Sequence, residues 1–354
     1  MSQRSSVLPS DTIVVSRRTG RRSVKFQRRA ALVTLGLLGL TISCGAIALI
    51  TGGYPIPLTD AIGALLGDRD GLADSIVVNW RLPRVLATLL FGAALGASGA
   101  LFQSLAANPL ASPDVVGFDS GAMTGALVVL LVLRAGPGSV AAGALIGGIA
   151  TAIAVYVLAY RRGVQGFRLI LVGIAVSAML AAVNQYLLVK ALRSGEIVSL
   201  QQVRYWAVGT LNGITWGNLR AAGLLLAVLL PAALVVSRPL RWIEMGDDAA
   251  TALGIRLNPT RVAIVLVGVG LTATVTSVCG PIGFVALAAP QLGRRLTRSA
   301  GVAVPAAMAM GAGLLGVSDL MAQRLFWVEL PVGAITVAVG GVYFVWLLFQ
   351  ETRR

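Results

Sequence analysis

Long apolar runs recur along this chain, and they constrain its fold more than any other feature. A membrane-spanning helix needs about 20 predominantly apolar residues, and in lipid only helices and closed barrels satisfy the backbone. Runs of this length indicate helices, so the sequence predicts an all-α polytopic membrane protein with about ten transmembrane helices. We place the spans at 30–50, 82–104, 115–134, 138–160, 167–190, 217–237, 260–279, 282–294, 302–322 and 331–350.

The composition supports this class and excludes a soluble one. Of the 354 residues, 56% are hydrophobic and 12% are charged, whereas soluble domains carry about 25% charged residues. The net charge of +15 lies in loops and in a tail, not on one soluble face, so we expect no nucleic-acid partner. Most of the 29 Lys and Arg fall on the side that the positive-inside rule assigns to the cytoplasm. Both termini are therefore expected in the cytoplasm.

Three regions follow from these patterns. Residues 1–29 are basic and lack apolar periodicity, which predicts a disordered cytoplasmic tail, while 30–350 form the transmembrane domain and 351–354 a cytoplasmic C-terminus. The short run at 282–294 is kept as a span because the chain must return to the cytoplasm before the next one. Cys44 and Cys279 lie within or beside apolar runs and are interpreted as packed hydrophobes.

A polar, helix-forming stretch at 245–256 interrupts the apolar pattern. It contains no His, no Cys and no Ser paired with a base, so it is unsuited to catalysis. A water-facing helix between two spans suits docking by another protein, and the alternative is an ordinary solvated loop.

Missing motifs narrow the function further. The sequence has no Gly-x-x-x-x-Gly-Lys-Ser/Thr loop and no His, so it cannot bind ATP through a P-loop. The spans hold almost no carboxylates, whereas proton-coupled carriers usually bury a relay of them. Asp319 is the exception, and it is interpreted either as a functional carboxylate or as a hydrated residue near a helix end. A secondary transporter remains the alternative from another class.

Six short motifs occur in order along the chain. They are Arg81-Leu-Pro-Arg84, Gly92-Ala-Ala-Leu-Gly-Ala-Ser-Gly99, Asn108-Pro-Leu-Ala-Ser-Pro-Asp114, Gly246-Asp247 with Ala250 and Leu253-Gly254, Gly280-Pro-Ile-Gly-Phe284, and Glu329-Leu-Pro-Val-Gly333. This ordered set resembles the FecCD-type iron-siderophore and vitamin B12 permeases of ATP-binding-cassette (ABC) importers, over about residues 30–350.

The resemblance implies a type II ABC importer permease fold and a transport function without enzymatic activity. It implies a second permease subunit, homologous or identical, two ATP-binding subunits, and a periplasmic or lipid-anchored substrate-binding protein. ATP and Mg would bind the partner ATPase, and this chain itself would hold no cofactor and no metal. The expected cargo is a ferric siderophore, with cobalamin or haem as alternatives, and the expected location is the cytoplasmic (inner) membrane of a bacterium.

The resemblance also implies roles for individual residues. The residues expected to couple to the ATPase are Gly246, Asp247, Ala250, Leu253 and Gly254. The arginines expected to dock the binding protein are Arg81, Arg84 and Arg324; the alternative is that they reach the membrane interface from helix ends. The residues expected to form the cytoplasmic gate are Asn108, Pro109, Leu110, Gly163 and Gln165, although a plain flexible loop is the alternative at 163–166.

One position departs from the pattern of the family. Many relatives have Pro-His where this chain has Pro290-Gln291. Glutamine does not titrate, so any role for a charged imidazole is absent here. Some relatives that carry ferric catecholate-type siderophores share the departure, which favours iron as cargo.

Overall fold

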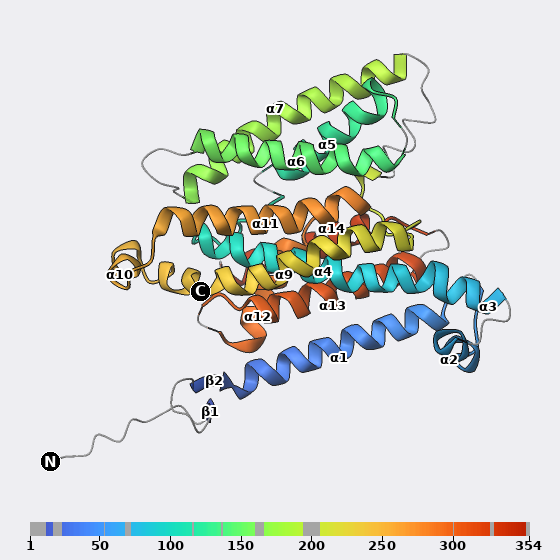
Figure 1. Ribbon diagram of the computed structural model, residues 1–354, viewed down its shortest axis with the longest axis horizontal. Coiled ribbons are helices and arrows are strands. Elements are labelled where there is room, and N and C mark those ends of the chain that lie inside the picture. Colours follow the sequence, from blue (N-terminus) through green and yellow to red (C-terminus); the bar gives the residue numbers. More distant parts are fainter. Residues whose placement is uncertain are drawn as a thin grey trace.

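The computed structural model describes residues 12–16, 23–52, 54–67, 72–114, 117–135, 137–159, 166–193, 206–299, 301–325 and 329–351. Helices dominate this part of the chain, and the long ones run roughly along one direction (Figure 1).

The helices are α1 (Arg28–Ile50), α2 (Leu58–Leu66), α3 (Leu72–Asp74), α4 (Leu82–Leu105), α5 (Phe118–Leu127), α6 (Pro137–Ala159), α7 (Gly166–Arg193), α9 (Trp216–Ile243), α10 (Asp247–Ala252), α11 (Leu257–Cys279), α12 (Val285–Thr297), α13 (Val304–Arg324) and α14 (Val332–Glu351). Two segments are π-helical. The first, η1 (Ser75–Arg81), continues into α4, and the second, η2 (Val128–Val132), follows α5.

The expected helical membrane class is confirmed by these elements. Seven described helices are long and apolar enough to cross a membrane, and each overlaps an expected span. Two shorter apolar helices, Phe118–Val132 and Val332–Tyr343, overlap the third and tenth spans. The expected span 282–294 corresponds to α12, which begins only at Val285. Ten crossings therefore remain a prediction.

Helix α4 lies at the centre of the bundle and contacts α9, α11, α12 and α13. Its glycines permit this, because a side chain at several of them would meet the backbone of a neighbouring helix. A Cβ on Gly92 would lie 2.5 Å from the carbonyl oxygen of Gly311, and one on Gly96 would collide with the carbonyl oxygen of Ala307. Small residues let helices approach closely in lipid, where burial of apolar surface gives no drive to associate.

Buried hydroxyls join α4 to α11. The Ser98 hydroxyl donates to the Gly268 carbonyl at 2.7 Å, and the Thr272 hydroxyl donates to Ser98 at 2.9 Å. Both side chains are buried, so these bonds satisfy groups that would otherwise be orphaned in an apolar interior.

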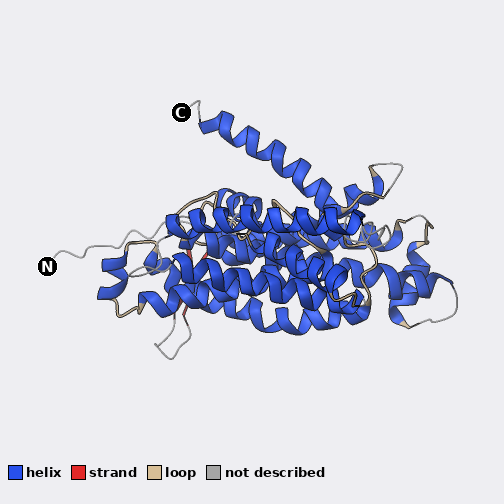
Figure 2. Ribbon diagram, turned by 90° about the horizontal axis from the view of Figure 1, so that it is seen from above, coloured by secondary structure: helices blue, strands red, loops and turns tan. Residues whose placement is uncertain are grey.

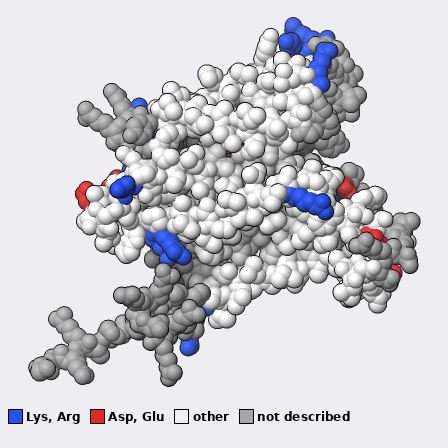
Figure 3. Space-filling view, viewed as in Figure 1, with Lys and Arg blue, Asp and Glu red and all other residues white. Residues whose placement is uncertain are grey.

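The surface of the bundle is mainly uncharged. Charged side chains gather toward the two ends of the molecule, and the belt between them is largely free of charge in the view of Figure 3. Helices α1, α7 and α9 present large apolar side chains to the outside, including Leu35, Met179 and Leu224. In Figure 2, α14 leads away from the other helices toward the C-terminus.

Two short segments of the N-terminal region are described, and the expected disorder over 1–29 stays a prediction. Strands β1 (Thr12–Ser16) and β2 (Ser23–Gln27) pair antiparallel, with Thr12 opposite Gln27. The stretch Thr12-Ile-Val-Val15 is rich in β-branched residues, which favour extended backbone. Helix α1 then begins at Arg28, two residues before the expected span.

We predict that Gly96→Ala weakens the packing of α4 against α13. The added methyl would collide with the Ala307 carbonyl, and overpacking of this kind costs about 1–3 kcal/mol. The measurement is the thermal unfolding midpoint of the purified chain in detergent.

The matched control is Gly223→Ala in α9, where an added Cβ meets nothing within 4 Å. Alanine is favoured over glycine in a helix interior by about 0.5–1 kcal/mol, so the control midpoint should stay or rise. Equal midpoints for the two variants would contradict the packing account.

Candidate functional site

The stretch at 245–256 contains the short helix α10, which lies at one end of the molecule (Figure 1). Glycines bracket it: Gly246 has φ 114° and Gly254 has φ 81°. Positive φ of this kind is inexpensive only for glycine. The two glycines therefore set the sharp turns by which the chain enters and leaves α10.

The two faces of α10 differ. Ala250 is fully buried and packs into the core of this chain. Asp247 and Asp248 in the first turn of α10 are exposed, and the flanking residues Met245 and Leu253 are 68% and 59% exposed. The surface available to a partner is therefore apolar and acidic, whereas Ala250 allows α10 to approach its own bundle.

An ion pair fixes α10 to the next helix. The Arg261 guanidinium on α11 donates to both carboxylate oxygens of Asp247 at 2.7 and 2.9 Å. Half of the Asp247 side chain is exposed, so the pair adds only about 0–1 kcal/mol to stability. Its consequence is geometric, because it orients α10 on the start of α11.

The segment 108–110 follows the end of α4, at the same end of the bundle as α10. The Asn108 backbone N–H donates to the Gln103 carbonyl at 3.1 Å, and the Asn108 side-chain oxygen accepts from the Leu110 N–H at 2.9 Å. Leu110 is 46% exposed. The turn thus presents an apolar side chain at the α10 end of the bundle. The other expected gate residues, Gly163 and Gln165, lie outside the described residues.

The Gln291 side chain holds this turn. Its Nε2 group donates to the Pro109 carbonyl at 3.1 Å and to the Gln103 side-chain oxygen at 2.8 Å. Gln103 in turn donates to the Leu287 carbonyl at 2.9 Å. The position that departs from the family pattern therefore connects α4, α12 and the turn.

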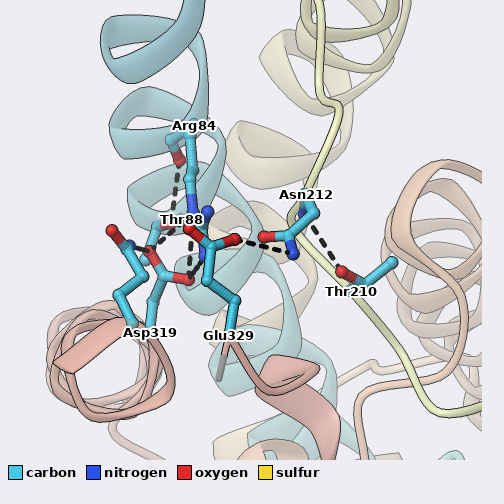
Figure 4. A network of polar contacts seen from close by, with 7 residues as sticks. Arg84, Thr88, Thr210, Asn212, Asp319 and Glu329 are labelled. Atoms are coloured by element: carbon cyan, nitrogen blue, oxygen red, sulfur yellow. Dashed lines mark hydrogen bonds and ion pairs between the residues drawn. The ribbon is translucent and has the colours of Figure 1, made fainter. Parts of the chain in front are cut away.

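The start of α4 lies at the end of the bundle opposite α10 (Figure 1), and polar contacts gather there (Figure 4). Arg84 at the start of α4 makes a bidentate ion pair with Asp319 of α13, with Nη2 to Oδ1 at 2.7 Å and Nε to Oδ2 at 3.2 Å. Gln323 donates to the same carboxylate at 2.8 Å. Asp319 is 3% exposed, so the interpretation of Asp319 as a hydrated residue is wrong, and Arg84 is engaged within the chain.

The other two expected docking arginines differ from each other. Arg81 donates to the carbonyls of Leu49 and Tyr54 at 2.7 and 2.5 Å, so it closes the turn after α1. Arg324 is exposed and has no ion-pair or hydrogen-bond partner in the part of the chain that the structure describes. Arg324 is therefore the arginine of the three that is available to a partner.

Asp119 in α5 is a second carboxylate within the spans, so the expectation that Asp319 is the exception is wrong. The Thr276 hydroxyl of α11 donates to Asp119 Oδ1 at 3.2 Å. The residue lies inside the expected span 115–134. A carboxylate at that position was the feature of the sequence from which it could have been identified. Over the described ranges, no group of three or more His, Cys, Asp or Glu could hold a metal ion.

Comparison with known proteins identifies the family to which this chain is similar. Residues 40–350 match the model of the FecCD transport family. The chain is 42% identical to the ferric enterobactin transport system permease protein of Escherichia coli, covering 92% of this chain and 98% of that protein. It is 34% identical to the achromobactin transport system permease protein of Dickeya dadantii, covering 93% and 96%.

A solved structure shows the same fold. It is that of a metal-chelate type ABC transporter in an inward-facing conformation, with a TM-score of 0.77 at 24% identity over 90% of this chain and 99% of the other. The order of the motifs, the helical bundle and the match over nearly the full length of the relatives all indicate the same family. The chain belongs to the FecCD transport family.

Proposed function

We propose that this chain is a permease subunit that moves a ferric siderophore through the cytoplasmic membrane of a bacterium. The observation that carries the proposal is the 42% identity, over almost the full length of both chains, to a permease named for ferric enterobactin. Relatives named for achromobactin and for ferric dicitrate support an iron chelate as cargo. Cobalamin and haem are the alternatives within the family.

Energy for transport comes from a separate ATPase in this proposal. The sequence has no P-loop, while the exposed side of α10 offers an apolar and acidic surface to a partner. The complex would contain a second permease subunit, two ATP-binding subunits and a substrate-binding protein. This chain would cross the membrane ten times, with both termini in the cytoplasm.

The geometry supports different roles for the two ends of the bundle. At the α10 end, ATP binding and hydrolysis in the partner would move α10, and the turn at 108–110 would open and close together with 163–166. At the opposite end, Arg324 would pair with acidic groups on the binding protein. Charge pairs of this kind steer and orient partners more than they add affinity.

A proton-driven carrier fits the site less well. Of the carboxylates within the described helical spans, Asp319 is neutralised by Arg84 at 2.7 Å and Asp119 accepts from Thr276. The two carboxylates lie on α13 and α5, and no described hydrogen bond links them. A relay would require hydrogen-bonded steps between such groups.

We predict that deleting this chain abolishes uptake of radiolabelled ferric enterobactin and leaves cobalamin uptake intact. Uptake should also stop when ATP is depleted and persist, over the time of the assay, with a protonophore when ATP is maintained. Loss of cobalamin uptake alone would change the cargo, and uptake that follows the proton gradient would replace the proposal by a secondary transporter.

We predict that Asp247→Ala combined with Leu253→Arg uncouples the transporter. The double change alters the charge and the apolar character of the exposed side of α10 and leaves the buried Ala250 in place. Membrane insertion should be normal, while copurification of the ATPase and ATP-driven uptake should fall by at least about tenfold, the effect of 1.4 kcal/mol.

A matched control makes the same types of change at the other end of the bundle. Asp60→Ala with Leu66→Arg alters an exposed aspartate and an exposed leucine on α2, so ATPase copurification should be unchanged. If the α10 variant retains normal uptake, the coupling role of α10 is wrong.

A further inference from the structure

The last turn of α4 lies between two features of the proposed function, the helix α10 and the turn at 108–110. Its residues Gln103 and Ser104 are 3% and 8% exposed, and they bond in different directions. We call this pair the α4 junction.

The hydrogen bond from Ser104 leads to Glu244, at the end of α9 just before α10. The Ser104 hydroxyl donates to Glu244 Oε1 at 2.5 Å, and the other oxygen, Oε2, accepts from the Val302 backbone N–H at 3.1 Å. Glu244 is the C-cap residue of α9 and lies two residues before Gly246. One carboxylate thus ties together the end of α9, the end of α4 and the segment between α12 and α13.

The bonds from Gln103 lead to the turn at 108–110. Its backbone carbonyl accepts from the Asn108 N–H at 3.1 Å, and its side-chain oxygen accepts from Gln291, whose Nε2 group also donates to Pro109. Hydrogen bonds therefore lead from Glu244 to Ser104 and from Gln103 to Gln291 and, through Gln291, to the Pro109 carbonyl. Ser104 and Gln103 are neighbours in the sequence, so the covalent backbone of α4 joins the two sets of bonds.

The placement of glycine favours transmission along this path. Gly246, with φ 114°, separates α10 from α9, and Glu244 lies two residues before it, at the end of α9. Helix α10 contacts α9 and α11, so force applied to α10 reaches the bundle through these two helices. Hydrogen bonds to charged groups are among the stronger ones available, so a Glu244 carboxylate is a suitable tie between α9 and α4.

We infer that the α4 junction transmits movement of α10 to the turn at 108–110, with Glu244 and Gln291 as positioning residues on its two sides. The inference rests on the proposed function, since it requires an ATPase that acts on α10. It adds residues outside the expected coupling and gate sets, and it assigns the Gln291 amide a donor role.

The test measures movement at the turn without relying on cargo. Leu110→Cys, at an exposed position, is labelled from the cytoplasmic face with a membrane-impermeant maleimide in the assembled transporter, with and without a non-hydrolysable ATP analogue. The native Cys44 and Cys279 are buried, so the chain without Leu110→Cys provides the blank. The readout is the ratio of the labelling rates in the two nucleotide states.

We predict that Glu244→Ala brings this ratio close to one while the ATPase still copurifies with the transporter. Gln291→Glu should act in the same way, because it keeps the size of the side chain but places an oxygen against the Pro109 carbonyl. Glu244→Gln retains an oxygen that accepts from Ser104 but cannot accept the Val302 N–H with its amide nitrogen. Its ratio should fall between the wild-type and Glu244→Ala values.

Transport per ATP hydrolysed provides the second readout. Glu244→Ala should reduce it by at least about tenfold, because it removes the bonds from both Ser104 and Val302 and the loss of one charge-assisted hydrogen bond alone corresponds to about that factor. Adding Ser104→Ala should cost little more, because both changes break the same bond. Asp60→Ala, at an exposed position on α2, is the control and should leave both readouts unchanged.

The outcomes separate the inference from the function on which it rests. A wild-type ratio that changes with nucleotide and stays changed in Glu244→Ala and Gln291→Glu would overturn the inference alone. A wild-type ratio that does not respond to nucleotide would overturn the coupling mechanism and the inference with it. Failure of siderophore uptake with an intact labelling response would overturn only the choice of cargo.

Discussion

Close packing of helix backbones around α4 is the constraint on which the rest of this structure depends. In lipid, helices gain little from burying apolar surface against one another, so contact requires small residues and satisfied polar groups. Gly92 and Gly96 meet the backbone of α13, and Ser98 bonds to α11. A helix held on several sides in this way can act as a rigid element between the two ends of the bundle.

The two ends of α4 are chemically distinct, and each is joined to a distant part of the chain. Arg84 pairs with Asp319 near one end, and Ser104 bonds to Glu244 at the other. An unpaired charge is expensive in this environment, so the Arg84–Asp319 pair is interpreted as a structural tie. In the proposed function this leaves Arg324 to pair with the binding protein, at the end of the bundle opposite α10.

Much of the fold could be predicted because it depends on local patterns. Apolar length predicted the long helices, and the polar stretch at 245–256 predicted α10. The partners of charged residues could not be predicted, because Arg84 and Asp319 are 235 residues apart and only tertiary packing brings them together. Asp119 is visible in the sequence as a carboxylate in an apolar run, but nothing local indicates that its partner is Thr276.

The most direct test of the account asks what touches the exposed side of α10. A photo-crosslinking amino acid at Leu253 in the assembled transporter should capture the ATP-binding subunit, and its yield should change when nucleotide binds. The same probe at Leu66 on α2 should not capture that subunit. Crosslinks from Leu253 only to lipid or to the binding protein would contradict the claim that energy enters this permease through α10.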